Sequence, residues 1–173
     1  GLVIQGNHGL NAGGFANHRT LQLAGSLVAD NERPAPNIFA DRLGVGGGLN
    51  DGHLLIVDSS ITRNHGYGVG GLMSMGDLTL RNCAVEDNVS ATKTGGVQSI
   101  TTDAARFARL TIQGGRFARN TGGSDTVSAG GIAALLTATS LTDVTITDNT
   151  GATGGLLAEQ SELTVQHAVV RGN

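Results

Sequence analysis

Residues 70–88, with the sequence GGLMSMGDLTLRNCAVEDN, contain the pattern that decides the fold of this chain. A Gly-Gly pair opens the stretch and an asparagine closes it. Apolar residues stand ten, eight and three positions before that asparagine. The pattern recurs along the chain, and internal repetition fixes the architecture before any other feature does. Six asparagines close a copy: Asn31, Asn64, Asn88, Asn120, Asn149 and Asn173.

The repeated positions form columns of equivalent residues. Five of the six residues ten positions before the asparagine are leucine, and Thr139 is the sixth. The residues three positions before it are Val28, Ile61, Val85, Phe117, Ile146 and Val170, and the Gly-Gly pairs begin at Gly13, Gly46, Gly70, Gly95, Gly130 and Gly154. Successive asparagines are 24 to 33 residues apart, and the extra length lies outside the pattern. This variation predicts two loop insertions, residues 32–45 and 98–109.

Short segments with apolar residues at alternate positions, bounded by Gly, Asn, Asp and Ser, are typical of strands. The 28 glycines disfavour helices. Because successive copies run in the same direction, each strand can pair in parallel with its counterpart in the next copy. We therefore expect an all-β fold in which residues 1–173 form one β-helix segment (solenoid) of about six rungs, single-stranded and parallel. The general rule for parallel connections predicts that it is right-handed.

The closing asparagines have a predicted structural role. Stacked side-chain amides can donate to and accept from one another, which predicts an asparagine ladder along the rungs. Asparagine also tolerates the left-handed backbone conformation, so we expect that conformation at the ladder positions. The general frequency of asparagine in turns explains one or two of these positions but not six in fixed register.

Acidic and basic residues alternate immediately before the ladder. This column is Asp30, Arg63, Asp87, Arg119, Asp148 and Gly172. Alternating signs avoid stacking like charges on neighbouring strands. We interpret the column as a solvated face whose single ion pairs contribute little stability.

Composition excludes several classes of function. With 39% hydrophobic and 14% charged residues the chain can bury a core, and no apolar run approaches the roughly 20 residues of a membrane-spanning helix. The net charge is −3 and the eleven basic residues are scattered, which argues against nucleic acid as a partner. The single cysteine, Cys83, stands in a column of small residues, and we expect a buried, inert thiol.

Both ends of the chain lack the polar cap that usually protects a solenoid. The sequence starts at Gly1 without a recognisable export signal, and Asn173 is itself a ladder position. We therefore expect a piece of a longer β-helix whose partner is the rest of a parent polypeptide.

The repeat resembles that of a known family. Gly-Gly-aliphatic triplets such as Gly130-Gly131-Ile132, followed by Phe117-x-x-Asn120 or aliphatic versions such as Ile61-x-x-Asn64, are similar to the repeats of polymorphic outer membrane proteins. That family belongs to the broader pectate-lyase-like group of right-handed β-helices. The resemblance covers almost the whole chain, although one copy alone has the aromatic residue. It implies a bacterial passenger or adhesin-like region, exported and sometimes autotransported, at the cell surface, outer membrane or extracellular space.

The competing class is a polysaccharide lyase, hydrolase or epimerase, because the same fold presents a long groove suited to a sugar chain. Such hydrolases need paired carboxylates. Glu86-Asp87 is the only adjacent acidic pair, and we expect its side chains on opposite faces of one strand. Calcium ligands could be assembled from Asp58 and Asp77 on neighbouring rungs or from Asp41 beside Arg42, but solvated loop charges are the simpler interpretation.

No complete catalytic constellation is present, so the sequence favours a non-enzymatic structural and adhesive role without cofactor, metal or assigned site residues. Host or environmental surface glycans or proteins are the expected partners. Possible aromatic contacts to a sugar are Tyr67, Phe15, Phe39 and Phe107. The insertion at 32–45, with Pro34, Pro36, Phe39 and Arg42, is the preferred binding loop, because long loops on rigid scaffolds carry function. Its deletion should leave folding intact and reduce adhesion.

Overall fold

The computed structural model describes residues 1–33, 44–101 and 108–173. In these ranges the chain forms twenty β-strands and no helix, so none of the described elements is a helix that could cross a membrane. The first ten strands are β1 (Val3–Gln5), β2 (Phe15–Asn17), β3 (Thr20–Ala24), β4 (Leu27–Ala29), β5 (Glu32–Arg33), β6 (Gly48–Asn50), β7 (His53–Val57), β8 (Ser60–Thr62), β9 (His65–Gly66) and β10 (Leu72–Ser74). The other ten are β11 (Asp77–Glu86), β12 (Val89–Ser90), β13 (Val97–Ile100), β14 (Ala108–Ala118), β15 (Ile132–Leu135), β16 (Thr137–Thr142), β17 (Thr145–Thr147), β18 (Leu156–Glu159), β19 (Glu162–Gln166) and β20 (Val169–Arg171).

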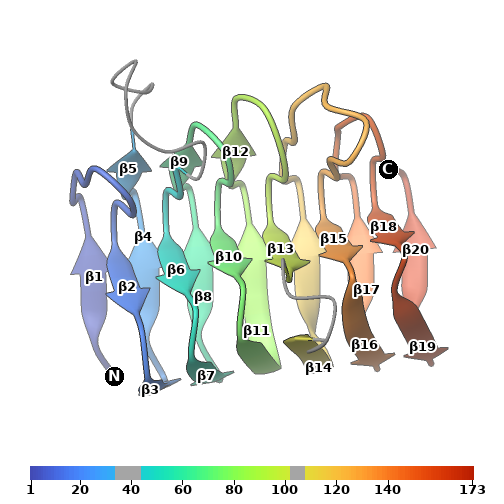
Figure 1. Ribbon diagram of the computed structural model, residues 1–173, viewed down its shortest axis with the longest axis horizontal. Helices are drawn as coiled ribbons and strands as arrows, with labels where there is room; N and C mark the ends of the chain where they lie inside the picture. The colour runs from blue at the N-terminus through green and yellow to red at the C-terminus, as the bar shows by residue number, and fades with distance from the viewer. Residues whose placement is uncertain (34–43, 102–107) are drawn as a thin grey trace.

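The strands form three sheets, and every pairing between them is parallel (Figure 1). The largest sheet has eleven strands, and in it β11 and β14 are long enough to pair with two shorter strands of a neighbouring copy. A six-stranded sheet has the order β18-β15-β13-β10-β6-β2, and a three-stranded sheet has the order β12-β9-β5. We call the residues that end at each ladder asparagine a unit. Each of the six units adds equivalent strands to the two larger sheets.

The register confirms the apolar columns that the sequence predicts. Leu54 pairs with Leu78, which pairs with Leu110. Val85 pairs with Phe117, and both are fully buried. These columns pack together as one hydrophobic core in which burial of each aliphatic side chain contributes roughly 1.5–3 kcal/mol. Like residues therefore stack on like residues through the interior.

The Gly-Gly pairs mark the closest approach between units. The N–H of Gly47 donates to the carbonyls of Gly70 and Gly71, at 3.0 and 3.1 Å. A Cβ atom on Gly47 would lie 2.5 Å from the carbonyl oxygen of Gly71, which is too close for any side chain. Glycine recurs here because the backbones of neighbouring units are in contact.

The asparagine ladder is present and has seven members. Asn7 precedes the six predicted positions, and each side-chain Nδ2 donates to Oδ1 of the next asparagine at 2.9 or 3.0 Å. The same Oδ1 accepts the backbone N–H of the preceding asparagine at 2.9–3.1 Å. From Asn31 on, Nδ2 also donates to the carbonyl of the apolar residue three positions before the preceding ladder asparagine. Each internal amide thus joins three units.

The left-handed backbone conformation lies one residue earlier than the sequence analysis places it. The ladder asparagines are not left-handed; the residues before them are, with φ between 53° and 57° at Asp30, Arg63, Asp87, Arg119 and Asp148. The backbone N–H of each ladder asparagine donates to Oδ1 of the next asparagine, so the left-handed bend falls on the residue before it. Charged residues adopt this disfavoured conformation at a cost of about 1 kcal/mol each.

The strands extend into both predicted insertions. Glu32 and Arg33 form β5, residues 98–100 belong to β13, and residues 108–109 begin β14. The central parts, residues 34–43 and 102–107, lie outside the described residues. The expectations for Pro34, Pro36, Phe39, Asp41, Arg42 and Phe107 therefore also fall outside them.

Candidate functional site

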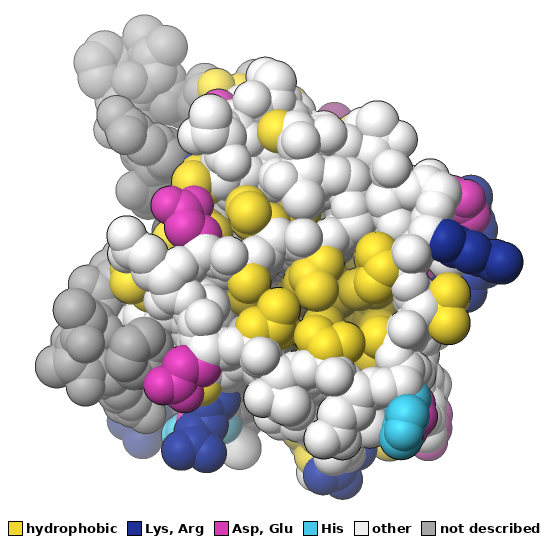
Figure 2. Space-filling model, turned by 90° about the vertical axis from the view of Figure 1, so that its right-hand side faces the viewer, with side chains coloured by type: hydrophobic (Ala, Val, Ile, Leu, Met, Phe, Trp, Pro, Cys, Tyr) yellow, Lys and Arg dark blue, Asp and Glu magenta, His cyan; other side chains and the backbone are white. Residues whose placement is uncertain are grey.

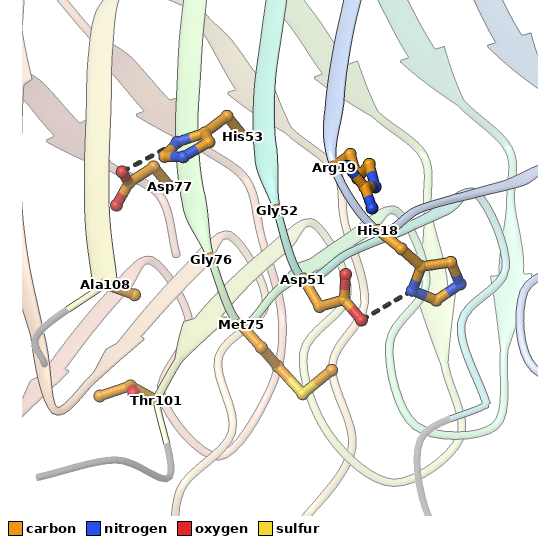
Figure 3. A pocket seen from close by; sticks show the side chains of 10 residues that line it. All are labelled: His18, Arg19, Asp51, Gly52, His53, Met75, Gly76, Asp77, Thr101 and Ala108. Atoms are coloured by element: carbon orange, nitrogen blue, oxygen red, sulfur yellow. Dashed lines mark hydrogen bonds and ion pairs between the residues drawn. The ribbon is translucent and has the colours of Figure 1, made fainter.

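Two adjoining hollows lie along one corner of the stack, where the six-stranded sheet turns into the eleven-stranded sheet. The first has a volume of about 380 Å³ and is lined by His18, Arg19, Asp51, Gly52, His53, Met75, Gly76, Asp77, Thr101 and Ala108 (Figure 3). The second has a volume of about 350 Å³ and is lined by Thr20, Leu21, Gln22, His53, Leu54, Leu55, Asp77, Thr79, Arg109 and Thr111. Both include His53 and Asp77. We call the two hollows together the corner groove.

The corner groove follows from the short connections between strands. Residues 18–19 join β2 to β3, residues 51–52 join β6 to β7, and residues 75–76 join β10 to β11. A second polar column braces these connections from inside. Asn17 Nδ2 donates to Asn50 Oδ1 at 2.7 Å, and Asn50 Nδ2 donates to the hydroxyl of Ser74 at 2.9 Å. Asn50 Oδ1 also accepts the N–H of Gly52 at 3.2 Å, so the connections are held at fixed positions.

The first pair of charged groups in the groove is His18 and Asp51. Their ring Nδ1 and carboxylate Oδ2 atoms are 2.7 Å apart (Figure 3). Since Asn17 and Asn50 are partners in the sheet register, the next residues, His18 and Asp51, come from equivalent positions of adjacent units. Both side chains are more than one-third exposed, so the pair is accessible to a ligand.

The second pair is His53 and Asp77, with 3.1 Å between Nδ1 and Oδ2. The two residues are register partners at the starts of β7 and β11. The other oxygen of Asp77 accepts the backbone N–H of Arg109 at 3.1 Å. Both carboxylate oxygens of Asp77 are therefore engaged. A neutral histidine that donates from Nδ1 presents Nε2 as an acceptor to whatever occupies the groove.

Two arginines complete the groove. Arg19 lines the first hollow and Arg109 the second. In the part of the chain that the structure describes, neither guanidinium has a hydrogen-bond or ion-pair partner. The two arginines match the two aspartates in number. The groove thus offers both donors and acceptors to a polar ligand.

Glu86 and Asp87 lie elsewhere, in the alternating charge column. Arg119 contacts both carboxylates, with Nη2–Glu86 at 2.9 Å and Nε–Asp87 at 2.8 Å, and Arg116 contacts Glu86 at 3.0 Å. The expectation of opposite faces is wrong, because the left-handed conformation of Asp87 brings its carboxylate to the same guanidinium as Glu86. The hydrogen bonds from Arg119 hold the pKa of the Asp87 carboxyl below its usual value.

The structure does not bring the proposed calcium ligands together. Asp58 accepts from Asn82 Nδ2 at 3.1 Å, whereas Asp77 belongs to the corner groove. Among the described residues there is no cluster of three or more His, Cys, Asp or Glu able to hold a metal ion. Cys83 is buried, as expected, and burial raises the pKa of its thiol, so it is a poor nucleophile.

The aromatic residues predicted as sugar contacts also lie apart from one another in the structure. Phe15 packs against the hydrophobic core. Tyr67 lines a smaller hollow of about 200 Å³ beside β5, β9 and β12, which shares no lining residue with the corner groove. His18, His53 and Asp51 are not among the residues predicted from the sequence. Their one signal is that each stands one to three residues after an asparagine of the second polar column. No protein-family model, curated protein or solved structure matches this chain.

Proposed function

We propose that this chain is a right-handed parallel β-helix with a structural and adhesive role, and that the corner groove binds an extended polar ligand such as a surface glycan. The observation that carries the proposal is that two histidine–aspartate pairs and two arginines, which have no side-chain partner among the described residues, line one groove whose backbone is fixed by stacked asparagines. Preorganised polar groups on rigid strands bind with little ordering cost.

The repeat supports the same assignment. Its resemblance to polymorphic outer membrane proteins favours an exported bacterial passenger region at the outer membrane surface or in the extracellular space. In such a protein the remainder of a longer polypeptide would be its first partner, and host or environmental glycans or proteins would be the second. Nucleic acid is disfavoured by the net charge of −3.

Binding is favoured over turnover because the carboxylates of the groove are engaged. Glycoside hydrolysis needs one carboxyl group as an acid and a second as a base or nucleophile. One oxygen of Asp77 accepts the N–H of Arg109, the other lies 3.1 Å from His53 Nδ1, and Asp51 is held by His18 at 2.7 Å. Neither carboxyl group is therefore free to act as the catalytic acid.

One observation favours a polysaccharide-active enzyme as the second candidate. A histidine oriented by an aspartate is a common general base. His53 and Asp77 have this relation, and Asp77 is itself fixed by the N–H of Arg109. A reaction initiated by proton abstraction would then use His53 Nε2.

Glycan-array binding of the protein, with and without calcium, tests the proposed function. We expect binding that falls about tenfold or more in the double variant His18→Ala/His53→Ala. His167→Ala is the matched control, because His167 pairs with Asp143 at 3.4 Å outside the groove. Equal loss in the control and the double variant would rule out the groove as the binding site.

Analysis of each bound glycan for cleavage products separates the two candidates. Intact glycan after prolonged incubation is the expected result. Products that form with the wild type and disappear in His53→Ala would establish the enzyme instead. Binding without cleavage, abolished by the double variant, supports the adhesive role.

A further inference from the structure

The outward face of the eleven-stranded sheet carries a patch of hydrogen-bond donors beside the histidine–aspartate pairs. Side chains alternate between the two faces of a strand, and the leucines before and after Thr79 are buried in the core, so Thr79 and Arg81 face outward. On the next strand, β14, Arg109 and Thr111 face outward for the same reason. Thr79, Arg109 and Thr111 line the second hollow of the corner groove.

The two threonines form the centre of this patch. They are register partners on β11 and β14, so their backbones lie about 4.8 Å apart. Both side chains are half-buried, and neither hydroxyl has a hydrogen-bond partner in the part of the chain that the structure describes. Each hydroxyl is able to donate one hydrogen bond. The pair therefore presents two donors, from adjacent units, to a single group of a ligand.

Two arginines stand at opposite corners of the threonine pair. Arg81 comes two positions after one threonine on β11, and Arg109 comes two positions before the other on β14. Both are exposed, and among the described residues neither guanidinium has an ion-pair partner. By contrast Arg116, farther along β14, pairs with Glu86 at 3.0 Å. Two guanidiniums on one small area are thus left to bind negative charge.

The carboxylate that lines the second hollow, Asp77, is already engaged. It lies beside Arg109, because the residues after them, Leu78 and Leu110, are register partners. One of its oxygens is 3.1 Å from His53 Nδ1, and the other accepts the backbone N–H of Arg109 at 3.1 Å. Since like charges repel, a second negative group is disfavoured next to Asp77 and favoured at the threonine pair, two positions farther along the strands.

Four donors that approach from different sides fit a tetrahedral oxyanion. A sulfate or phosphate ester carries three terminal oxygens that point in different directions. A carboxylate has two oxygens in one plane, and a single guanidinium fork satisfies both of them. Arginine suits such oxyanions because its planar group donates to two oxygens at once. The chemistry of the patch therefore favours a sugar with such an ester over an uncharged sugar.

We propose that the second hollow of the corner groove binds a sulfate or phosphate ester of a glycan. The ester oxygens accept from the hydroxyls of Thr79 and Thr111 and from the guanidiniums of Arg81 and Arg109. This inference rests on the proposed function and names the class of glycan. Nucleic acid also carries phosphate, but it is held by a row of cations, whereas the eleven basic residues of this chain are scattered.

Glycan pairs that differ in the ester alone test the proposal on the full chain. The probes are a heparin-derived oligosaccharide with its desulfated form, and a phosphorylated mannose oligosaccharide with its dephosphorylated form. We expect the ester to raise the affinity about tenfold or more, and this gain to disappear in Arg81→Gln/Arg109→Gln and at high ionic strength. Arg116→Gln is the matched control, because its guanidinium is engaged by Glu86 on the same sheet. Circular dichroism checks that each variant is folded.

Inorganic sulfate, titrated into the isotope-labelled chain and followed by NMR, separates this inference from the proposed function. We expect saturable shifts of the Thr79 and Thr111 amide signals that disappear in the double arginine variant. Such shifts without binding of any glycan would overturn the glycan as the ligand and leave a site for free anions.

Three other results would overturn the inference. The first is glycan binding that depends on His18 and His53 but not on the ester, which would leave the proposed function intact. The second is an equal loss of affinity in Arg116→Gln and in the double arginine variant. The third is tighter binding of a single-stranded oligonucleotide than of the sulfated glycan, which would make nucleic acid the carrier of the anion.

Discussion

Among single residues, the ladder asparagines make the most specific contribution to the fold. Asn88 is fully buried, and its side chain makes four hydrogen bonds: Oδ1 accepts from the N–H and Nδ2 of Asn64, and Nδ2 donates to Asn120 Oδ1 and to the Ile61 carbonyl. The repeat predicts contacts between side-chain amides alone. The backbone contacts arise because the amide lies against the main chain of both neighbouring units.

Replacement of Asn88 by alanine should therefore lower the free energy of unfolding by about 3 kcal/mol, because buried donors and acceptors lose their partners. Chemical denaturation measures the change. Asn173→Ala is the matched variant, since Asn173 is exposed at the end of the ladder, where water replaces the lost contacts. We expect it to be much less destabilised. Equal losses in the two variants would mean that burial does not strengthen the ladder.

Among the structural elements, the left-handed corners carry the alternating charges. Arg63 contacts Asp30 at 2.7 Å, and Arg119 contacts Asp87 at 2.8 Å, each pair linking two units. Hydrogen bonds from these arginines hold the pKa values of both aspartates below the usual value. A carboxyl group with a depressed pKa in the folded state stabilises the protein above the pKa of the unfolded chain, about 3.9. That stability is lost as pH falls through the folded value.

The melting temperature of Asp87→Asn should lie below that of the wild type at neutral pH. The difference should shrink as the pH falls from about 4 toward 2, because the wild-type carboxylate becomes protonated. Thermal scans over this range measure it. Asp148→Asn is the control, since Asp148 occupies the same column without a side-chain partner among residues 108–173. A difference for Asp87→Asn that stays constant with pH would contradict the assigned pairing.

The repeat predicted the parallel strands and the apolar columns because similar residues recur at the same offsets from each asparagine. Residues at the same offset in successive copies are then expected to pair with one another. The repeat missed Asn7, since the Gly-Gly pair and two of the three apolar positions of that copy would lie before Gly1. It missed the second column because Asn17, Asn50, Ser74 and Ser99 differ in type although they stack in register. The corner groove could not be predicted from the sequence for a related reason. His18 and His53 stand two positions apart relative to the strands, and only the turn between sheets brings them to one surface.

Over the whole molecule, the stack has a braced interior and two unlike ends. The side chains of the core and both polar columns run through it from unit to unit, which makes the surface of the corner groove rigid. At the C-terminal end the same contacts stop at exposed apolar side chains (Figure 2). The proposed binding function lies on the side of the stack, where the corner groove is.

Hydrogen exchange at the ladder backbone tests the central claim, that stacked asparagines hold the units in register. The N–H groups of Asn31, Asn64, Asn88 and Asn120 each donate to the Oδ1 of the next asparagine, at 2.9–3.1 Å, in a buried setting. Residue-resolved exchange measured by NMR should find them as protected as the N–H groups of the central strands β11 and β14. Exchange of these four amides as fast as that of exposed turn residues would contradict the account.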